Sequence, residues 1–271
     1  MKTLIAGPWV GEFGWELFGW NAYVRVLSRQ FDKTIVISRA NSQELYSDFA
    51  DEYIPYEPEG GLSDAFFMHN LDINQAFKKV VTTNKISLTP DTTVFVPRRI
   101  GFPPHTHYTQ HVLLGEHLVQ PEYICFGQES DTPYDYVFHI RDRELRKEDN
   151  WSLDNWRNLK ELLGNKRIAC IGTPTESACI EGTDDLRGHN LKEVFTVLRN
   201  AQCAFGPSSG PMHLASLCGT PHIVWSKDAN KERYEENWNP LSTKVLFTSE
   251  HSWQPSPEFI YNKFVTWSTT E

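Results

Sequence analysis

Two stretches of the chain carry groups that bind phosphate oxygens. The first is a cluster of cations directly after the apolar run YVFHI at 136–140: Arg141, Arg143, Arg146 and Lys147. The second is AFGPSSGPMHLASLCGTPHIVW at 204–225, which predicts a tight turn, a short helix, a second turn and a buried strand. Guanidinium and ammonium groups, and the N–H groups at a helix N-terminus, favour anions. Both stretches are candidates for holding a phosphate or the oxygens of a sugar. The alternatives are a solvated charged face and a capped core helix without a ligand.

Two carboxylates follow the first predicted strand. Residues 2–6 read as a buried strand and residues 7–11 as a loop, after which Glu12 and Glu16 lie one helical turn apart. In open α/β folds, ligands gather at the carboxyl ends of the strands. One of these acids could therefore act as a general base, with the other supporting it. The alternative is a glutamate that is simply well placed at a helix N-terminus.

A third stretch, residues 97–120, mixes cations with flat rings. We expect this stretch to contact an acceptor molecule that carries a sugar or a base, because aromatic rings stack on sugars or bases while arginines bind phosphate. The candidates are Arg98, Arg99, His105 and Tyr108, together with the early tryptophans Trp9 and Trp15. The alternative is an exposed loop followed by a helix from about Gln110. A zinc site is disfavoured, because His105, His107 and His111 lack a fourth ligand at a suitable spacing.

The elements that would position these residues alternate between strands and helices. Apolar runs predict strands over 2–6, 34–38, 93–96, 136–140, 167–172, 203–205, 222–225 and 243–248. The alternation predicts two Rossmann-like halves, although the first glycine loop lacks the G-x-G-x-x-G spacing of a dinucleotide site. The polar segment at 128–135 divides the chain into a first domain (1–130) and a second domain (131–255), followed by a terminal helix (256–271).

Composition limits the class of protein. The chain has 271 residues, 39% hydrophobic and 23% charged, which suits a globular enzyme with a sizeable core. A net charge of −9 disfavours nonspecific binding of nucleic acid. The five cysteines include no C-x-x-C pair, which predicts reduced thiols and a cytoplasmic setting. No apolar run is long enough for a membrane span, and the N-terminal one is too short for a signal peptide.

Several motifs carry a resemblance to one enzyme family. GPSSGPMHLASLCGTPHIVW resembles the signature D-S/T-G-P-x-H-L-A-x-x-x-G-x-P of the heptosyltransferase-like glycosyltransferases, family 9, with Ser208 in place of the aspartate. The pair Gly11-Glu12, the segment 151–159 and the turn 172–176 also match the pattern of that family. The run His139-Ile140-Arg141 is similar to the H-x-R segment by which some fucosyltransferases hold a diphosphate.

The resemblance implies the GT-B fold, an α/β architecture of two Rossmann-like domains facing a central cleft. It implies that residues 1–130 bind the acceptor, that residues 131–255 bind the donor, and that the terminal helix (256–271) packs back on the first domain. It also implies an inverting hexosyl- or pentosyltransferase with Glu12, or else Glu16, as catalytic base. The co-substrate would be a nucleotide-diphosphate sugar, without a further cofactor. No metal is expected, because no D-x-D pair follows a strand. The residues expected to bind the donor are His139, Arg141, Arg143, Arg146, Lys147, Thr173, Glu176, Ser208, Ser209, Gly210 and His213.

The acceptor and the class of activity stay open at this level. A sugar of a surface glycan or lipopolysaccharide core is the default of the resembling family. The hydroxymethylated bases of phage-type DNA are the competitor, since compact transferases with this architecture modify them. Two other classes share the architecture: a non-catalytic nucleotide-sugar binding protein and a sugar-nucleotide epimerase.

Overall fold

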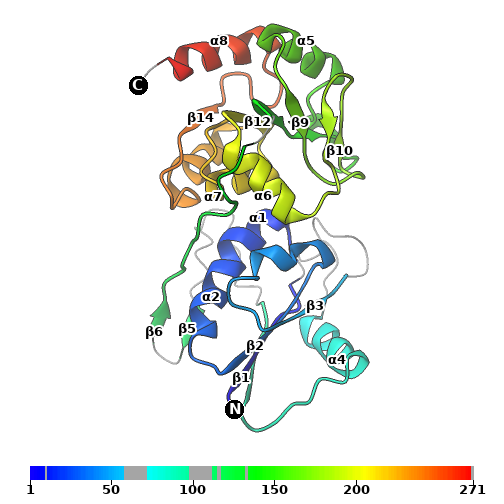
Figure 1. Cartoon of the computed structure of the whole chain (residues 1–271), viewed down its shortest axis with the longest axis vertical. Helices are drawn as coiled ribbons and strands as arrows, with labels where there is room; N and C mark the ends of the chain where they lie inside the picture. The colour runs from blue at the N-terminus through cyan, green and yellow to red at the C-terminus, as the bar shows by residue number, and fades with distance from the viewer. Residues whose placement is uncertain (10, 58–71, 98–111, 115–116, 132–133, 270–271) are drawn as a thin grey trace. The chain divides into compact units, whose positions relative to one another are not determined.

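A computed structural model describes residues 1–9, 11–57, 72–97, 112–114, 117–131 and 134–269. The chain forms two compact units, Met1–Glu122 and Tyr123–Glu271, so the division falls after Glu122 rather than near residue 130 (Figure 1). Each unit contains its own parallel sheet. The fold class expected from the sequence, two Rossmann-like α/β domains, is confirmed.

The first unit is built on a four-stranded parallel sheet in the order β3-β2-β1-β4. The apolar runs predicted three of these strands, and the fourth, β3, is an edge strand with only one buried residue, Ile54. The strands are β1 (Thr3–Ala6), β2 (Lys33–Ser38), β3 (Glu52–Pro55) and β4 (Thr92–Phe95).

One helical segment connects β1 to β2. Its middle turn is π-helical. The segment consists of α1 (Phe13–Trp15), the π-helix η1 (Glu16–Asn21) and α2 (Ala22–Ser28). Within η1, Trp20 stacks on Phe95 of β4, with ring centroids 4.9 Å apart. Phe95 pairs in register with Ala6, so this segment covers the Ala6 face of the sheet.

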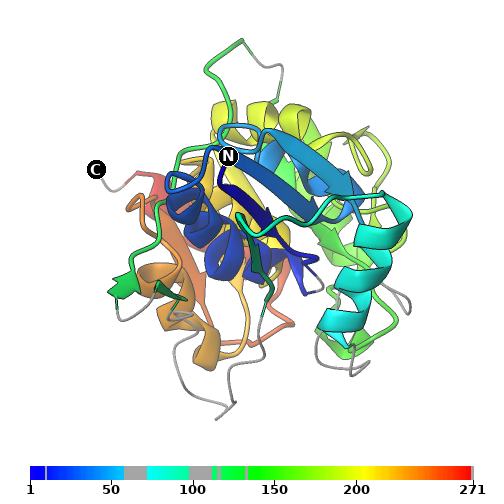
Figure 2. The ribbon, with the colours of Figure 1, turned by 90° about the horizontal axis from the view of Figure 1, so that it is seen from below.

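The opposite face of the same sheet is covered by α4 (Ile73–Thr83), drawn in cyan beside the blue strands in Figure 2. Its Val80 packs with Ile5, Ile35 and Ile37. After β4, two short apolar runs pair antiparallel as β5 (Val112–Leu114) and β6 (His117–Val119). The helix expected from about Gln110 is therefore wrong over these residues, because runs of three residues separated by a short connection favour a hairpin.

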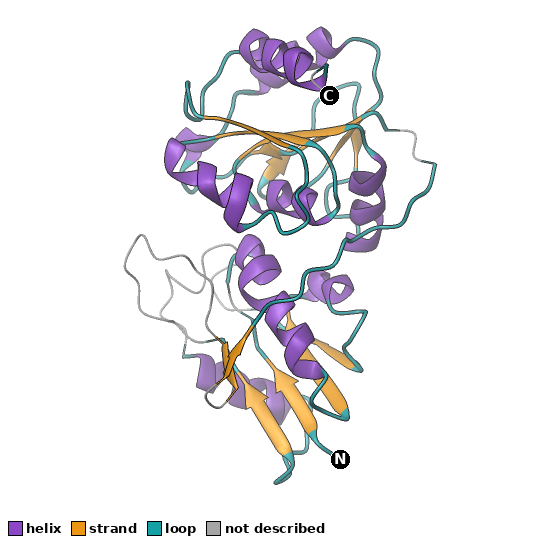
Figure 3. Cartoon of the chain, turned by 90° about the vertical axis from the view of Figure 1, so that its left-hand side faces the viewer, coloured by secondary structure: helices purple, strands orange, loops and turns teal. Residues whose placement is uncertain are grey.

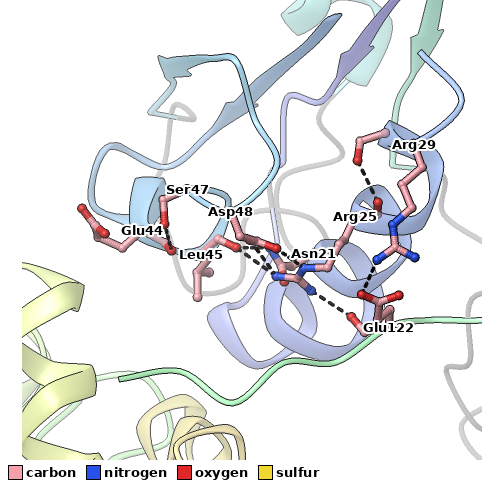
Figure 4. A network of polar contacts seen from close by, with 9 residues as sticks. Asn21, Arg25, Arg29, Glu44, Leu45, Ser47, Asp48 and Glu122 are labelled. Carbon is pink, nitrogen blue, oxygen red and sulfur yellow. Dashed lines mark hydrogen bonds and ion pairs between the residues drawn. The ribbon is translucent and has the colours of Figure 1, made fainter. Parts of the chain in front are cut away.

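Arg25 ties the end of the first unit to its helical segment (Figure 4). The guanidinium is buried, donates to both carboxylate oxygens of Asp48 (2.7 and 3.2 Å), and donates to the carbonyl of Glu122 (2.8 Å). The Glu122 carboxylate in turn pairs with Arg29. Because Glu122 is the last residue of the unit, this network fixes the point at which the chain leaves it.

The second unit is built on a six-stranded parallel sheet in the order β11-β9-β7-β12-β13-β14. A separate two-stranded antiparallel pair joins β8 and β10. The strands are β7 (Tyr136–Phe138), β8 (Ile140–Arg141), β9 (Ile168–Cys170), β10 (Ser177–Ala178), β11 (Asp184–Asp185), β12 (Cys203–Pro207), β13 (His222–Trp225) and β14 (Val245–Thr248).

Helices cover both faces of this six-stranded sheet (Figure 3). The helices α5 (Leu153–Leu163) and α8 (Pro257–Ser268) pack together on one face, and α6 (Leu191–Asn200) and α7 (Gly210–Leu217) lie on the other. The terminal helix was expected on the first domain. It belongs to the second unit, where Ile260 is fully buried in the core and Phe264 and Trp267 pack against it. No helix in the described ranges has the length and apolarity needed to cross a membrane.

Candidate functional site

Four parallel strands of the second unit deliver their carboxyl ends to one edge of the sheet. There, β7 leads to His139 and Arg141, β9 to Thr173, β12 to Ser208 and Ser209, and β13 to the loop that contains Tyr234. Because β7 and β12 are direct neighbours, the cationic segment and the start of α7 leave the sheet side by side. This edge is where an open α/β sheet holds its ligands.

Arg141 is the buried cation of this edge. Its exposed fraction is only 4%, and its Nε donates to Asn150 Oδ1 at 3.2 Å. The Nη2 atom is buried and has no hydrogen-bond partner among the described residues; the nearest acidic oxygen, Asp149 Oδ2, is 3.9 Å away. Burial and the neighbouring Arg143 and Arg146 lower the pKa of Arg141 to about 10, so the guanidinium is still charged at neutral pH. A buried, charged donor with unused capacity suits an anionic ligand.

Asn150 fixes the loop that carries the cations. Its Oδ1 accepts from Arg141 Nε and from the Arg143 N–H, both at 3.2 Å, and its Nδ2 donates to the Arg143 carbonyl at 2.8 Å. Gln254 donates to the carbonyls of Glu148 (3.0 Å) and Asn150 (2.9 Å). Asn150 therefore holds both Arg141 and the backbone of Arg143, and Gln254 holds the end of the loop from a distant segment.

The remaining cations of the run have different surroundings. Arg143 is mostly buried and lies 3.4 Å from the Glu176 carboxylate, which brings together two predicted donor-binding residues. Arg146 is exposed, adopts a left-handed backbone with φ +56°, and lies 3.8 Å from Asp149. Lys147 is exposed at the start of a short 3-10 turn. Of these four cations, only Arg141 and Arg143 have largely buried side chains.

His139 is buried and its ring is already engaged. Its Nδ1 lies 3.2 Å from the carbonyl of Ile171, and burial lowers its pKa to about 4, so the imidazole is neutral at pH 7. Gly172 is next to it with φ +136°, and an added Cβ would come within 2.4 Å of Ser177 Oγ. The close approach of Ser177 to this turn requires glycine here. Thr173 is exposed at the same turn.

The turn before α7 contains Ser208, Ser209 and Gly210, all partly exposed. The N–H of Ser209 donates to the Tyr234 hydroxyl at 2.9 Å. His213, one turn into α7, is buried and stacks on the Tyr234 ring with centroids 4.0 Å apart. Burial lowers the pKa of His213 well below its ordinary value. His213 was predicted to touch the donor, whereas its burial beneath Tyr234 gives it a packing role.

In the first unit, Glu16 is the centre of a closed polar network. It is 0% exposed and accepts from Arg39 Nε (3.0 Å) and Arg39 Nη2 (2.5 Å). Further hydrogen bonds come from the hydroxyls of Ser38, Ser42 (2.8 Å) and Tyr46 (2.8 Å). Burial and the Glu16 charge raise the pKa of Tyr46 well above its ordinary value, so this hydroxyl remains a donor. A carboxylate with five donors has little capacity left for a substrate proton, so the geometry makes Glu16 a structural residue.

Glu12 lies in a different setting. It is half-buried at the end of the loop after β1 and precedes α1, and its side chain makes no capping hydrogen bond to that helix within the described part of the chain. Trp9, predicted to contact the acceptor, is buried: its Nε1 donates to the Gly11 carbonyl (3.1 Å) and its ring stacks on Trp20 (5.7 Å). Trp15 is partly exposed within α1. The structure thus gives Trp9 a core role and leaves Glu12 and Trp15 as candidates.

Four predicted acceptor residues, Arg98, Arg99, His105 and Tyr108, lie outside the described residues, as do the three histidines of the zinc alternative. Over the ranges that are described, no group of three or more His, Cys, Asp or Glu side chains is arranged to hold a metal ion.

Sequence reasoning missed two residues of the donor edge, Tyr234 and Asn150. Both lie in polar segments, and each makes contacts to residues 7 to 26 positions away. No periodic pattern reports such contacts. Tyr234 could have been suspected only because an aromatic residue in the charged run KERYEEN needs a buried partner.

Each unit has a parallel sheet with helices on both faces, and comparison with solved structures identifies the whole as the GT-B fold. No protein-family model and no curated protein sequence matches the chain. Among solved structures, Escherichia coli heptosyltransferase WaaC with ADP is similar over 98% of this chain and 100% of its own (TM-score 0.63, 14% identity). E. coli ADP-heptose lipopolysaccharide heptosyltransferase II is similar over 98% of each chain (TM-score 0.60, 15% identity). A family 9 glycosyltransferase from Veillonella parvula is similar over 98% of this chain and 96% of its own (TM-score 0.60, 11% identity). At these identities the likeness establishes the fold.

Proposed function

We propose that this protein is a glycosyltransferase that transfers a sugar from a nucleotide-diphosphate sugar to an acceptor hydroxyl, with inversion and without a metal. The observation that carries the proposal is Arg141, a buried guanidinium whose Nη2 has no hydrogen-bond partner among the described residues. It lies at the carboxyl edge of a Rossmann-like sheet, beside the strand that leads into α7. A diphosphate supplies the charge and the acceptor oxygens that this group lacks.

Each part of the edge has a role in holding the donor. Arg141 and Arg143 neutralise the charge that grows on the leaving diphosphate as the glycosidic bond breaks. The start of α7 adds its N–H groups and its positive dipole. Among proteins with a similar fold, WaaC has been solved with ADP and with ADP-2-deoxy-2-fluoro heptose, which supports a nucleotide sugar as the class of donor.

Glu12 is the proposed base. Its carboxylate takes the proton of the acceptor hydroxyl while the oxygen attacks the anomeric carbon in line with the departing diphosphate. Glu16 is assigned to the scaffold, because five hydrogen bonds already use its oxygens. Two acceptors are to be compared: a sugar of the lipopolysaccharide-core type and a hydroxymethylated DNA base.

The donor half of the proposal is tested by thermal stabilisation. The protein is melted with UDP, GDP, ADP or CDP and with the matching nucleoside monophosphates. A ligand at 100 times its Kd adds about 2.7 kcal/mol to the stability of the folded state. We expect one nucleoside diphosphate to raise the Tm more than its monophosphate. A Tm unchanged by all the diphosphates would refute a diphosphate site.

The catalytic half is tested with Glu12→Gln. This variant should keep the donor affinity and lose on the order of 100-fold or more in turnover, the usual range for removing a general base. A binding protein would show no transfer in either form. An epimerase would change the free sugar nucleotide without an acceptor, and this outcome would also contradict the proposal.

A further inference from the structure

Tyr234 connects two elements that are far apart in the sequence. It belongs to the π-helical turn η5 (Arg233–Asn237), and it is 0% exposed. Its hydroxyl accepts the N–H of Ser209 at 2.9 Å and donates to Ser208 Oγ at 3.2 Å, with the Ser209 carbonyl as a second acceptor at 3.3 Å. Burial raises the pKa of Tyr234 to about 12, so the hydroxyl keeps its proton at neutral pH. One phenolic group therefore holds both serines of the turn.

The hydroxyl of Ser209 is not used in the way that N-cap residues use theirs. Three other helices of the second unit, α5, α6 and α8, have Ser152, Asn190 and Ser256 as their N-cap residues, and each of these side chains accepts an N–H from the first turn. Ser209 holds the same position before α7 and makes no such bond. Its Oγ is buried and has no hydrogen-bond partner among the described residues. The usual capping bond is absent, and the residue's own N–H is satisfied by Tyr234.

Contacts with other aromatic rings fix the position of the Tyr234 side chain. It stacks on His213 of α7 at 4.0 Å with an interplanar angle of 12°, and the edge of the His213 ring meets Trp238 at 4.6 Å. The ring of Phe247 in β14 also packs against Tyr234, with the ring centroids 5.8 Å apart. Moving the hydroxyl away from the turn would break this stack. Tyr234 therefore packs against α7 and also holds the turn from which that helix starts.

We infer that Tyr234 is a positioning residue of the diphosphate site: it clamps the Ser208–Ser209 turn so that the Ser209 hydroxyl is directed to a phosphate oxygen of the donor instead of capping α7. The inference rests on the proposed function. It also specifies the chemistry, because the Ser209 O–H and the Arg141 Nη2 are both donors at one edge of the sheet, and a pair of donors fits an anionic oxygen.

The test combines Tyr234→Phe, which keeps the stacked ring and removes only the hydroxyl, with Ser209→Ala. Both variants and the double variant are titrated by calorimetry with the one of UDP, GDP, ADP and CDP that most raises the Tm of the wild type. Each single variant should weaken binding about tenfold, the loss expected for one hydrogen bond to a charged group. The double variant should bind no worse than Ser209→Ala alone, because Tyr234 acts through Ser209.

Tyr261→Phe is the matched control, since Tyr261 lies in α8 on the opposite face of the sheet, and it should bind as the wild type does. Melting curves establish that each variant is folded. If Tyr234→Phe binds as tightly as the wild type, or if the two substitutions multiply in the double variant, the positioning role is overturned while the diphosphate site stands. If the wild type binds none of the four nucleotides, the site itself is refuted and the role of Tyr234 falls with it.

Discussion

Glu16→Gln separates a structural carboxylate from a catalytic one. The substitution keeps the volume of the side chain but leaves one acceptor oxygen where Glu16 has two. An amide NH2 in place of Oε2 opposes the donors of Arg39 and Ser42, and in place of Oε1 it opposes the hydroxyls of Ser38 and Tyr46. Arg39 is itself buried, so its charge loses its partner inside the unit. Breaking a buried ion pair by removing one partner costs about 3–5 kcal/mol.

The loss is measured by urea unfolding followed by tryptophan fluorescence, since Trp20 lies in the same π-helical turn as Glu16. We expect the first unit of Glu16→Gln to unfold at a lower urea concentration, with a lower Tm by about 10 °C. Glu52→Gln, which breaks a surface ion pair with Lys33 in the same unit, is the matched control and should change the stability by less than about 1 kcal/mol. A Glu16→Gln variant within about 1 kcal/mol of the wild type, but with its turnover abolished, would refute the structural assignment and make Glu16 the base.

Three further predictions concern other parts of the chain. Acid should destabilise the second unit. Burial lowers the pKa of His139 and of His222 to about 4, so between pH 6.5 and 4 the unfolded chain binds protons that the folded chain does not. The unfolding free energy should therefore fall as the pH falls, by roughly 3 kcal/mol per histidine once below pH 4; urea unfolding from pH 7 to 4 measures the slope, and a flat profile would contradict it. Arg25→Met should lower the Tm of the first unit, because it removes the group that donates hydrogen bonds to Asp48 and Glu122, at a cost of about 3 kcal/mol or more. Its control is Arg157→Met, which breaks an exposed ion pair and should change the stability by less than about 1 kcal/mol. Gly7→Ala should prevent normal folding of the first unit, because its φ is +124° and a Cβ would lie 2.1 Å from the Ile37 carbonyl oxygen; a circular dichroism spectrum and a Tm like those of the wild type would contradict this.

Much of the scaffold was predictable because local pattern determines it. The helix Leu191–Asn200 has its apolar residues at helical spacing, the pattern of a helix packed on one face. The strand His222–Trp225 is a continuous apolar run, as a buried parallel strand requires. The edge strand Glu52–Pro55 was missed because only one of its residues is buried, which leaves no pattern to detect.

The candidate site was predictable only in part, because its geometry depends on contacts between distant residues. Position after a strand was enough to select Arg141 and the Ser208–Ser209 turn. It could not distinguish Glu12 from Glu16, since the donors that surround Glu16 come from Ser38 to Tyr46, in the next strand and the turn after it. Likewise, nothing near His213 in the sequence indicates that Tyr234 covers it.

The central claim, a diphosphate site at Arg141, is tested most directly by calorimetric titration of wild type, Arg141→Met and Arg157→Met with the nucleoside diphosphate that most stabilises the protein. Melting curves establish that each variant is folded, and Arg141→Lys provides a second variant that keeps the charge. We predict that Arg141→Met weakens binding by about 10- to 100-fold, as expected for losing a charged hydrogen bond. Arg157→Met should bind as the wild type does. Unchanged affinity in a folded Arg141→Met variant would contradict the account.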